Sequence, residues 1–262
     1  MPLYHKKFIN PASKEWVVFI HGAGGSSSIW FRQIRHFKRF FNVLLVDLRG
    51  HGNSADVDLG PIDYSFENIS KEVIEVLDHL NIEKAHFVGI SLGTILIQTI
   101  ADLEPNRVKS MILGGAILRL DFRSQFLVGM GNVFKKVVPY MWLYRLFAWV
   151  IMPRRRHRKS RLMFVNDAKK LCQSEFLRWY SLTFKVNSLV RYLKQNDNGI
   201  PTIYLMGSED HMFLPPVRAV VEKEKNALLS IIKDSGHVCN VDQAKIFNEL
   251  ATAFIQKNVQ NA

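Results

Sequence analysis

The sequence predicts an α/β fold in which helices flank a mostly parallel sheet, with a helical cap inserted into it. Short apolar runs rich in β-branched and aromatic residues alternate with segments of helical periodicity in the first and last parts of the chain. This alternation fails between about residues 117 and 198, where helical periodicity continues without a strand pattern. A chain of 262 residues suits one large domain or a domain with an insertion.

The apolar runs and the periodic segments define the expected elements. Buried strands are expected at residues 16–20, 43–46, 85–88, 111–113, 202–205 and 228–232. Helices are expected at residues 29–40, 65–80, 92–103 and 242–257, the second with Ser65 as its N-cap. We therefore predict a core of residues 1–117 and 199–262, with a helical cap at 118–198 between its two halves.

The composition is that of an ordinary globular protein, with 48% hydrophobic and 22% charged residues. Its two cysteines, Cys172 and Cys239, are far apart and lack Cys-x-x-Cys spacing, so neither a disulfide framework nor a zinc site is predicted. The N-terminal residues contain no apolar run of the length that a signal peptide needs. We expect a cytoplasmic protein, which a peripheral contact could bring to a membrane.

The formal net charge of +12 is concentrated in one segment of the chain. Between Arg119 and Arg161, eleven lysines and arginines accompany a single acidic residue, Asp121. Such an excess can attract nucleic acid or an anionic membrane surface. No nucleic-acid-binding fold accompanies the charge, so nucleic acid is not expected, and contact between the basic cap and anionic lipid stays as a hypothesis.

A Gly-x-Ser-x-Gly motif spans residues 89–93, directly between a predicted strand and a predicted helix. This context is typical of a nucleophile elbow, a sharp turn that holds a serine above the edge of a sheet. Gly89 and Gly93 would leave the room that such a turn needs, and Ser91 would be the nucleophile. The alternative is a plain turn, because the motif alone also occurs by chance.

A glycine-rich segment, HGAGGSS at residues 21–27, follows the first predicted strand. Small residues let backbone amides face a cavity, and one such donor is worth roughly 2.7 to 4 kcal/mol of barrier in acyl transfer. We assign the oxyanion hole to the amides of Ala23 and Leu92. A phosphate-binding loop is less favoured, because the spacing fits neither common phosphate-binding motif.

A serine nucleophile needs a base, and histidine has a suitable intrinsic pKa. Among nine histidines, His237 follows the last predicted strand, where its loop opens at the edge of the sheet that carries Ser91. The competing histidines near loops are His21, His51 and His211. Asp210, after the strand at 202–205, is the favoured orienting acid, and its neighbour Glu209 is the fallback.

With these residues in place, the sequence resembles the α/β-hydrolase superfamily, within it the cap-bearing esterase, lipase and C–C hydrolase-like branch. The matching segments are HGAGGSS at 21–27, DLRGHGNS at 47–54, GISLG at 89–93, GSEDHMFLP at 207–215 and SGH at 235–237. The chain departs from the family in a short region before Trp16, where the first antiparallel strands could be reduced, and in a cap without a matching motif. Serine rather than aspartate at position 91 argues against haloalkane dehalogenase and epoxide hydrolase chemistry.

The segment from Val137 to Met152 is apolar apart from Arg145 and is flanked by basic residues, including Lys135 and Lys136. Its length corresponds to about 24 Å of helix, short of a hydrocarbon core of about 30 Å, so a spanning helix is not expected. It is either a cap helix over an acyl pocket or an interfacial helix that also touches anionic lipid. The expected substrate-binding residues are Trp142, Arg145, Phe147 and Trp149.

The sequence therefore predicts a serine hydrolase that cleaves carboxylic esters with an apolar acyl or aryl group, monoacylglycerol-like lipids included. Catalysis is expected to proceed through an acyl-enzyme on Ser91, with no metal or organic cofactor. One alternative is a C–C bond hydrolase or lyase that acts on an acidic small molecule with the same three residues. Another is a non-catalytic receptor or regulator with a hydrolase fold.

Overall fold

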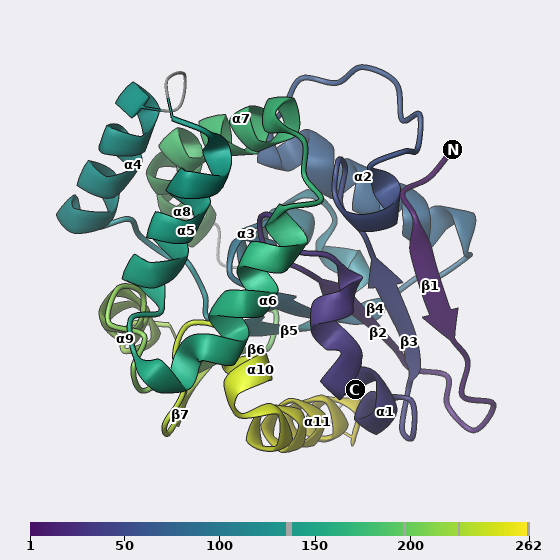
Figure 1. The fold of residues 1–262 in the computed structure, drawn as a ribbon. Coiled ribbons are helices and arrows are strands. Elements are labelled where there is room, and N and C mark those ends of the chain that lie inside the picture. Colours follow the sequence, from purple (N-terminus) through teal and green to yellow (C-terminus); the bar gives the residue numbers. More distant parts are fainter. Residues whose placement is uncertain (135–137, 196–197, 225, 261–262) are drawn as a thin grey trace.

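A seven-stranded sheet forms the centre of the protein in a computed structural model that describes residues 1–134, 138–195, 198–224 and 226–260 (Figure 1). The strand order is β1-β3-β2-β4-β5-β6-β7, and β1 is antiparallel to β3 whereas the other pairs are parallel. The strands are β1 (His5–Phe8), β2 (Trp16–Ile20), β3 (Asn42–Val46), β4 (Ala85–Ile90), β5 (Val108–Gly114), β6 (Thr202–Gly207) and β7 (Ala227–Ile232).

All six expected strands are present, and the mostly parallel sheet is confirmed. The additional strand, β1, is an edge strand of four residues with the sequence HKKF. Its central lysines are exposed, and an edge strand that faces solvent lacks the apolar signal by which buried strands are recognised. This is why the sequence pattern did not reveal it.

Helices cover both faces of the sheet because alternate strand residues point to opposite sides. In β2, Val18 and Ile20 pack towards α2 (Phe66–His79) and α3 (Leu92–Leu103). Val17 and Phe19 pack on the other face, towards α1 (Phe31–Phe37) and α11 (Ala244–Gln260). The remaining short elements of the core are η1 (Ser27–Trp30), η2 (Gly52–Ser54), η3 (Pro105–Arg107), α9 (Leu214–Val221) and α10 (Cys239–Asp242).

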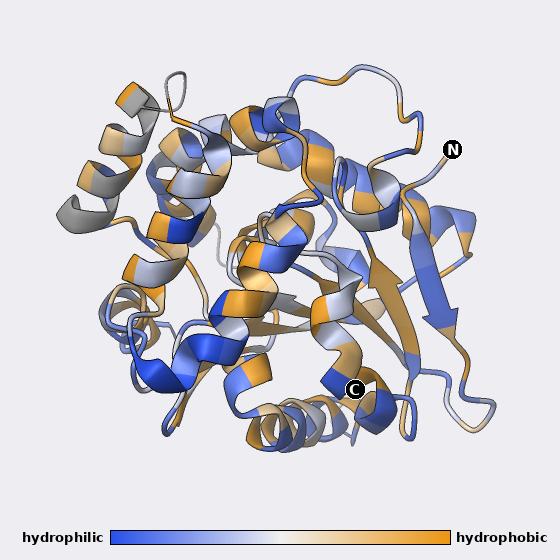
Figure 2. Ribbon diagram, viewed as in Figure 1, coloured by the Kyte–Doolittle hydropathy of each residue, from blue (hydrophilic) through white to orange (hydrophobic). Residues whose placement is uncertain are grey.

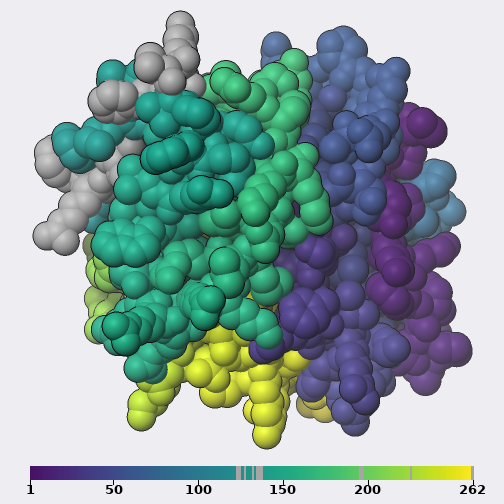
Figure 3. All heavy atoms as spheres, viewed as in Figure 1, coloured from purple at the N-terminus to yellow at the C-terminus, as the bar shows by residue number. Residues whose placement is uncertain are grey.

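Between β5 and β6 the described residues form helices and no strand. These elements are α4 (Phe122–Phe134), α5 (Tyr140–Ile151), η4 (Arg155–His157), α6 (Arg158–Ala168), α7 (Gln173–Leu182), η5 (Thr183–Lys185) and α8 (Val186–Gln195). We call this helical segment the cap; its teal and green atoms form one lobe beside the N-terminal half of the chain (Figure 3). Lys135, Lys136 and Val137 lie outside the described residues. Across the described ranges, no helix has both the length and the apolar character needed to cross a membrane.

Candidate active site

Ser91 occupies the sharp turn between β4 and α3. Its backbone has a φ of 56° and a ψ of −124°, a left-handed conformation that costs of order 1–3 kcal/mol and is found at functional sites. The turn leaves no space for side chains on its flanks, as a Cβ at Gly93 would lie 2.5 Å from the carbonyl oxygen of Ile20. A Cβ at Gly89 would lie 2.5 Å from a methyl carbon of Ile97. The glycines of the motif therefore permit the close approach of α3 to β2 and β4.

Three side chains that the sequence singled out lie in hydrogen-bonding contact. His237 Nε2 is 2.8 Å from Ser91 Oγ, and His237 Nδ1 is 2.8 Å from Asp210 Oδ2. His237 is 3% exposed and Asp210 1% exposed, whereas Ser91 is partly exposed to the cavity above it. With the proton on Nδ1, the histidine donates to the carboxylate and its Nε2 can accept the serine proton.

The fold explains this convergence. Ser91, Asp210 and His237 follow the carboxyl ends of β4, β6 and β7, which lie along one edge of the sheet. The second carboxylate oxygen of Asp210 accepts a hydrogen bond from the amide of Phe213, at 3.2 Å. Gly115, with a φ of +48°, allows the His237 backbone to approach the end of β5, because a Cβ there would lie 2.2 Å from the His237 carbonyl oxygen.

Ala23 and Leu92, the predicted oxyanion-hole residues, both line the cavity beside Ser91. Within the described residues, neither backbone amide donates a hydrogen bond to another group of the protein. Gly22 brings the loop close to the nucleophile, since a Cβ there would lie 3.0 Å from the Cβ of Ser91. The positions of both amides are therefore compatible with binding a substrate oxygen at Ser91.

The segment at residues 47–54 forms hydrogen bonds with the loop at residues 21–27. His51 Nε2 accepts a hydrogen bond from the amide of Gly24 at 2.8 Å, and His21 Nε2 accepts one from the amide of Leu48 at 3.0 Å. Asp47 also accepts a hydrogen bond from the amide of Ser27, at 2.6 Å. Burial, together with the neighbouring His21, lowers the pKa of His51 to about 3, and burial also lowers the pKa of His21. Both imidazoles are therefore neutral acceptors that join two loops, and neither contacts Ser91 in place of His237.

An apolar cavity of about 160 Å³ opens between the cap and Ser91. Its polar end is formed by Ser91, His237 and the loop at Ala23. Aliphatic and aromatic side chains of the core and cap form most of the remaining wall, including Ile95, Leu120, Ile151, Phe164, Phe176, Trp179 and Phe213. No Lys, Arg, Asp or Glu side chain is among the described residues that line it.

Of the four expected substrate-binding residues, Phe147 lines the cavity and the other three do not. Trp142 is 68% exposed and Trp149 58% exposed, and Arg145 also lies on the surface. These three side chains do not reach the cavity because α5 buries another face, which carries Leu143, Tyr144 and Ala148. A helix that is apolar almost all the way round does not reveal from its sequence which face is buried.

Tyr144 is a site residue that sequence reasoning missed. Its buried hydroxyl donates a 2.5 Å hydrogen bond to the carbonyl oxygen of Ala23, and its ring packs at a tilt of 34° against Phe164 with a centroid distance of 4.5 Å. Gly24 leaves room for this contact, because a Cβ there would overlap the Tyr144 hydroxyl. The sequence carries no signal for this pairing, since 121 positions separate the two partners.

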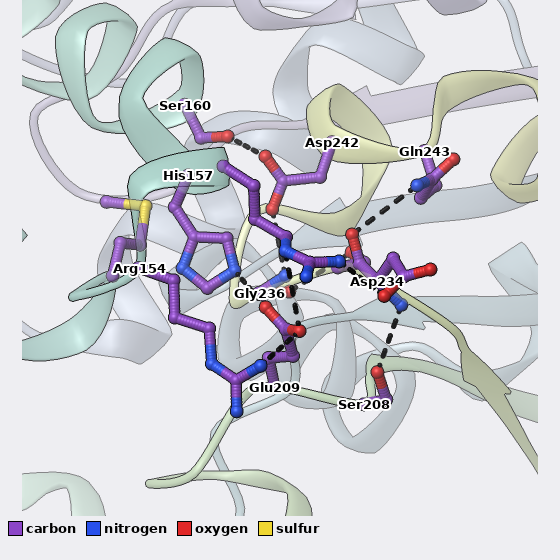
Figure 4. Close-up of polar contacts among 12 residues, drawn as sticks. Arg154, His157, Ser160, Ser208, Glu209, Asp234, Gly236, Asp242 and Gln243 are labelled. Atoms are coloured by element: carbon purple, nitrogen blue, oxygen red, sulfur yellow. Dashed lines mark hydrogen bonds and ion pairs between the residues drawn. The ribbon is translucent and has the colours of Figure 1, made fainter.

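A second contact joins the cap to the loops that carry Asp210 and His237 (Figure 4). Glu209 Oε2 is 2.9 Å from Nε2 of the fully buried His157, and Glu209 Oε1 accepts a 2.5 Å hydrogen bond from Arg154. Arg156 forms an ion pair with Asp234. Glu209 therefore contacts the cap, whereas Asp210 contacts His237.

The same connection reaches the backbone beside His237. Asp242 accepts a hydrogen bond from Ser160 of α6 and, through Oδ2, another from the amide of Gly236 at 2.8 Å. The amide of Glu209 donates to the carbonyl oxygen of Ser235 at 2.9 Å, so the two loops are also bonded to each other. We refer to the set Arg154, Arg156, His157, Ser160, Glu209, Asp234 and Asp242 as the polar clasp.

A family model described as the alpha/beta hydrolase fold matches residues 15–137, which include the predicted oxyanion segment and the nucleophile elbow. The strand order, the turn at Ser91 and the match, which covers 123 of the 262 residues, together define the class of the protein as the α/β-hydrolase fold. Across the described ranges, no group of three or more His, Cys, Asp or Glu residues is arranged to hold a metal ion.

Relatives and solved structures agree with this class. RutD of Acinetobacter baylyi is 28% identical over 260 residues, which cover 92% of this chain and 93% of RutD. The 3-oxoadipate enol-lactonase 2 of the same organism is 33% identical over 109 residues, 42% of this chain and 40% of the lactonase. The structure of a hydrolase from Oleispira antarctica matches with a TM-score of 0.85 at 18% identity, over 96% of this chain and 94% of that one; this likeness concerns the fold alone.

Proposed function

We propose that the protein is a serine esterase that cleaves carboxylic esters with an apolar acyl or aryl group through an acyl-enzyme on Ser91. The observation that carries the proposal is the 2.8 Å contact between His237 Nε2 and Ser91 Oγ at the end of an apolar cavity. A serine hydroxyl becomes an effective nucleophile only when an oriented base can take its proton. Similarity to a lactonase supports the same reading, since a lactone is a cyclic ester.

In the proposed reaction, Ser91 Oγ attacks the ester carbonyl carbon while its proton passes to His237 Nε2. Asp210 orients the imidazole and stabilises its positive charge, and the amides of Ala23 and Leu92 bind the oxyanion. The C–O bond to the alcohol then breaks, and the alcohol leaves with the proton from His237. Water, deprotonated by the same histidine, then attacks the carbonyl carbon of the acyl-enzyme. The bond between this carbon and Ser91 Oγ breaks, Ser91 takes back the proton from His237, and the carboxylic acid is released.

The wall of the cavity favours neutral substrates over acidic ones. A buried carboxylate needs an ion pair or several hydrogen bonds, because its desolvation costs several kcal/mol or more. The described residues that line the cavity include no lysine or arginine to pair with it. This observation disfavours C–C hydrolysis of an acidic substrate, because Arg145 lies on the surface and does not line the cavity.

Covalent labelling tests the proposal directly. We expect a fluorophosphonate probe to label the protein at Ser91, as mapped by mass spectrometry, and nitrophenyl esters to be hydrolysed with an acyl-chain preference. Ser91→Ala should abolish labelling and lower kcat/KM by at least about a thousandfold. Exposed Ser188, changed to Ala, is the matched control and should behave as the unmodified protein. A folded protein that neither labels at Ser91 nor turns over any ester would contradict the proposal and favour a binding role.

A further inference from the structure

The outer side of the cap exposes large apolar side chains on two adjacent helices. Trp142 (68%), Leu146 (42%) and Trp149 (58%) are exposed on α5 at spacings of four and three residues, which place them on one face of the helix. Phe126, Met130 and Val133 are exposed on α4 at the same spacings. We call these six residues the apolar face of the cap; α4 and α5 lie together on the side of the molecule away from β1 (Figure 1).

A groove of about 310 Å³ runs between the two helices within this face. Met130 and Gly131 of α4 form one wall, and Trp142, Leu146 and Phe147 of α5 contribute to the other. Contiguous exposed apolar surface of this kind is uncommon in proteins that bind nothing there, because it leaves water in contact with side chains that burial would stabilise. The face therefore indicates a partner that covers it.

The charge around the face indicates an anionic partner. Between Asp121 and Asp167 the sequence contains no Asp or Glu, and neither α4 nor α5 carries an acidic residue. Arg154 and Arg156 are occupied in the polar clasp. Four other exposed cations of α5, the connection and the first turn of α6 pair with no carboxylate of the described residues: Arg145, Arg155, Arg158 and Lys159. The connection is the strongly hydrophilic stretch of the cap in Figure 2.

An apolar face next to unpaired cations fits an anionic bilayer, in which apolar side chains enter the acyl boundary and cations meet the headgroups. The length of α5, 12 residues, suits a helix that lies along the surface. We propose that the apolar face of the cap docks on an anionic lipid surface.

The docking site would also give substrates a short path to the nucleophile. Phe147 lines both the surface groove and the cavity above Ser91, so this one side chain lies between them. Its ring stacks on Tyr180, with a centroid distance of 6.2 Å and an interplanar angle of 7°. A lipid ester could pass from the bilayer through the groove, past Phe147, to Ser91. This second step rests on the proposed esterase function, whereas docking does not.

Vesicle flotation tests docking without turnover. The full chain carrying Ser91→Ala is floated with vesicles of phosphatidylcholine alone and of phosphatidylcholine with phosphatidylserine, at low and high salt. We expect flotation with the phosphatidylserine vesicles and its loss at high salt, because salt screens the headgroup contacts. Arg145→Glu should lower the partition coefficient about tenfold, whereas Arg35→Glu, on the exposed surface of α1, should leave it unchanged.

A matched leucine pair separates the apolar contribution from general surface effects. Leu146→Ser, on the apolar face, should lower partitioning severalfold, whereas Leu228→Ser, 52% exposed on β7, should not. Absence of flotation at low salt, or equal flotation of the two leucine variants, would overturn the proposal. Self-association that Leu146→Ser abolishes, without vesicle binding, would also overturn it and identify a second copy of the chain as the occupant.

Delivery of substrate needs a second measurement. We expect the ratio of hydrolysis of a vesicle-borne long-chain ester to that of a soluble short-chain ester to fall severalfold in Leu146→Ser and to stay constant in Leu228→Ser. An unchanged ratio in both variants would refute the delivery of substrate through the groove. Docking would then be judged by the flotation result alone. Failure of fluorophosphonate labelling with successful flotation would instead refute the esterase proposal alone.

Discussion

At the scale of single residues, the contact between Tyr144 and Ala23 connects the cap to the proposed oxyanion hole. The hydroxyl donates to the carbonyl oxygen of Ala23, a residue whose amide we propose to bind the substrate oxygen. Because the ring is buried, the pKa of Tyr144 is raised well above its usual value and the hydroxyl stays protonated as a donor. We therefore expect the side chain to affect the reaction through the position of the loop that carries Ala23.

Removing this hydroxyl should slow catalysis more than it lowers stability. Tyr144→Phe keeps the ring and leaves a buried carbonyl oxygen without its donor, a loss of roughly 1–3 kcal/mol. Without this hydrogen bond the Ala23 amide should be less well aligned with the substrate oxygen. We therefore expect kcat for a short-chain nitrophenyl ester to fall about tenfold with little change in KM. Tyr140→Phe is the control, since its hydroxyl donates to Leu171 within the cap. Equal kinetics of the two variants would exclude a role for Tyr144 in positioning the loop.

At the scale of elements, the connection between α5 and α6 also joins the cap to the core through ion pairs. The arginines from Arg154 to Arg161 differ in their contacts. Arg154 and Arg156 bind Glu209 and Asp234, Arg161 donates to the carbonyl oxygen of Met152, and Arg155 and Arg158 are exposed. His157 is fully buried against Glu209 and Gly236, where a glycine is needed because a Cβ would lie 2.7 Å from the imidazole. The polar clasp thus fixes the cap to both loops of the proposed catalytic machinery.

Weakening the polar clasp should affect the alignment of His237 and Asp210. Glu209→Gln removes the charge that Arg154 and His157 share, and we expect kcat to fall about tenfold with KM within about threefold of its original value. Glu175→Gln is the control, because Glu175 also joins the cap to the core, through Tyr64, but away from these loops. Steady-state kinetics and thermal unfolding should be measured on both. A fall in melting temperature without a selective loss of kcat in Glu209→Gln would mean a purely structural role.

At the scale of the whole molecule, buried neutral histidines link stability to pH. Burial lowers the pKa of His51 to about 3 and that of His86 to about 4, from an ordinary value of 6.5, and also lowers the pKa of His21. At pH values between the folded-state pKa and the ordinary value of 6.5, the unfolded chain binds more protons than the folded protein, so the free energy of unfolding rises with pH. Conversely, stability falls as pH drops below about 6.5 and continues to fall towards the folded pKa values.

We therefore expect acid to destabilise the protein before its carboxylates titrate. From pH 7 to pH 5, each histidine that stays neutral in the fold should cost about 2 kcal/mol of unfolding free energy. His51→Gln, which keeps an acceptor for the Gly24 amide, should reduce this loss, and exposed His79→Gln should not. Urea unfolding at several pH values measures the slope. A slope unaffected by His51→Gln would show that this residue does not carry the linkage.

Much of the fold and of the candidate site could be predicted from local sequence, because each motif is contiguous and directly follows a strand. Parallel strands bring their carboxyl ends to one edge of the sheet, so placing Ser91, Asp210 and His237 after three strands was enough to predict their meeting. The 2.8 Å contacts between them agree with that expectation. Their catalytic roles remain the prediction that labelling of Ser91 would test.

Tertiary structure alone decided the features that depend on pairs of distant segments. Glu209 and Asp210 are adjacent in sequence, yet one contacts His157 of the cap and the other His237. The apolar residues of α5 are spread around the helix, so only packing determined that Tyr144 turns inward and Trp142 outward. Periodicity reports that a helix has an apolar face, but the partner of that face is set by contacts with other segments of the chain, such as that of Tyr144 with Ala23, 121 positions away.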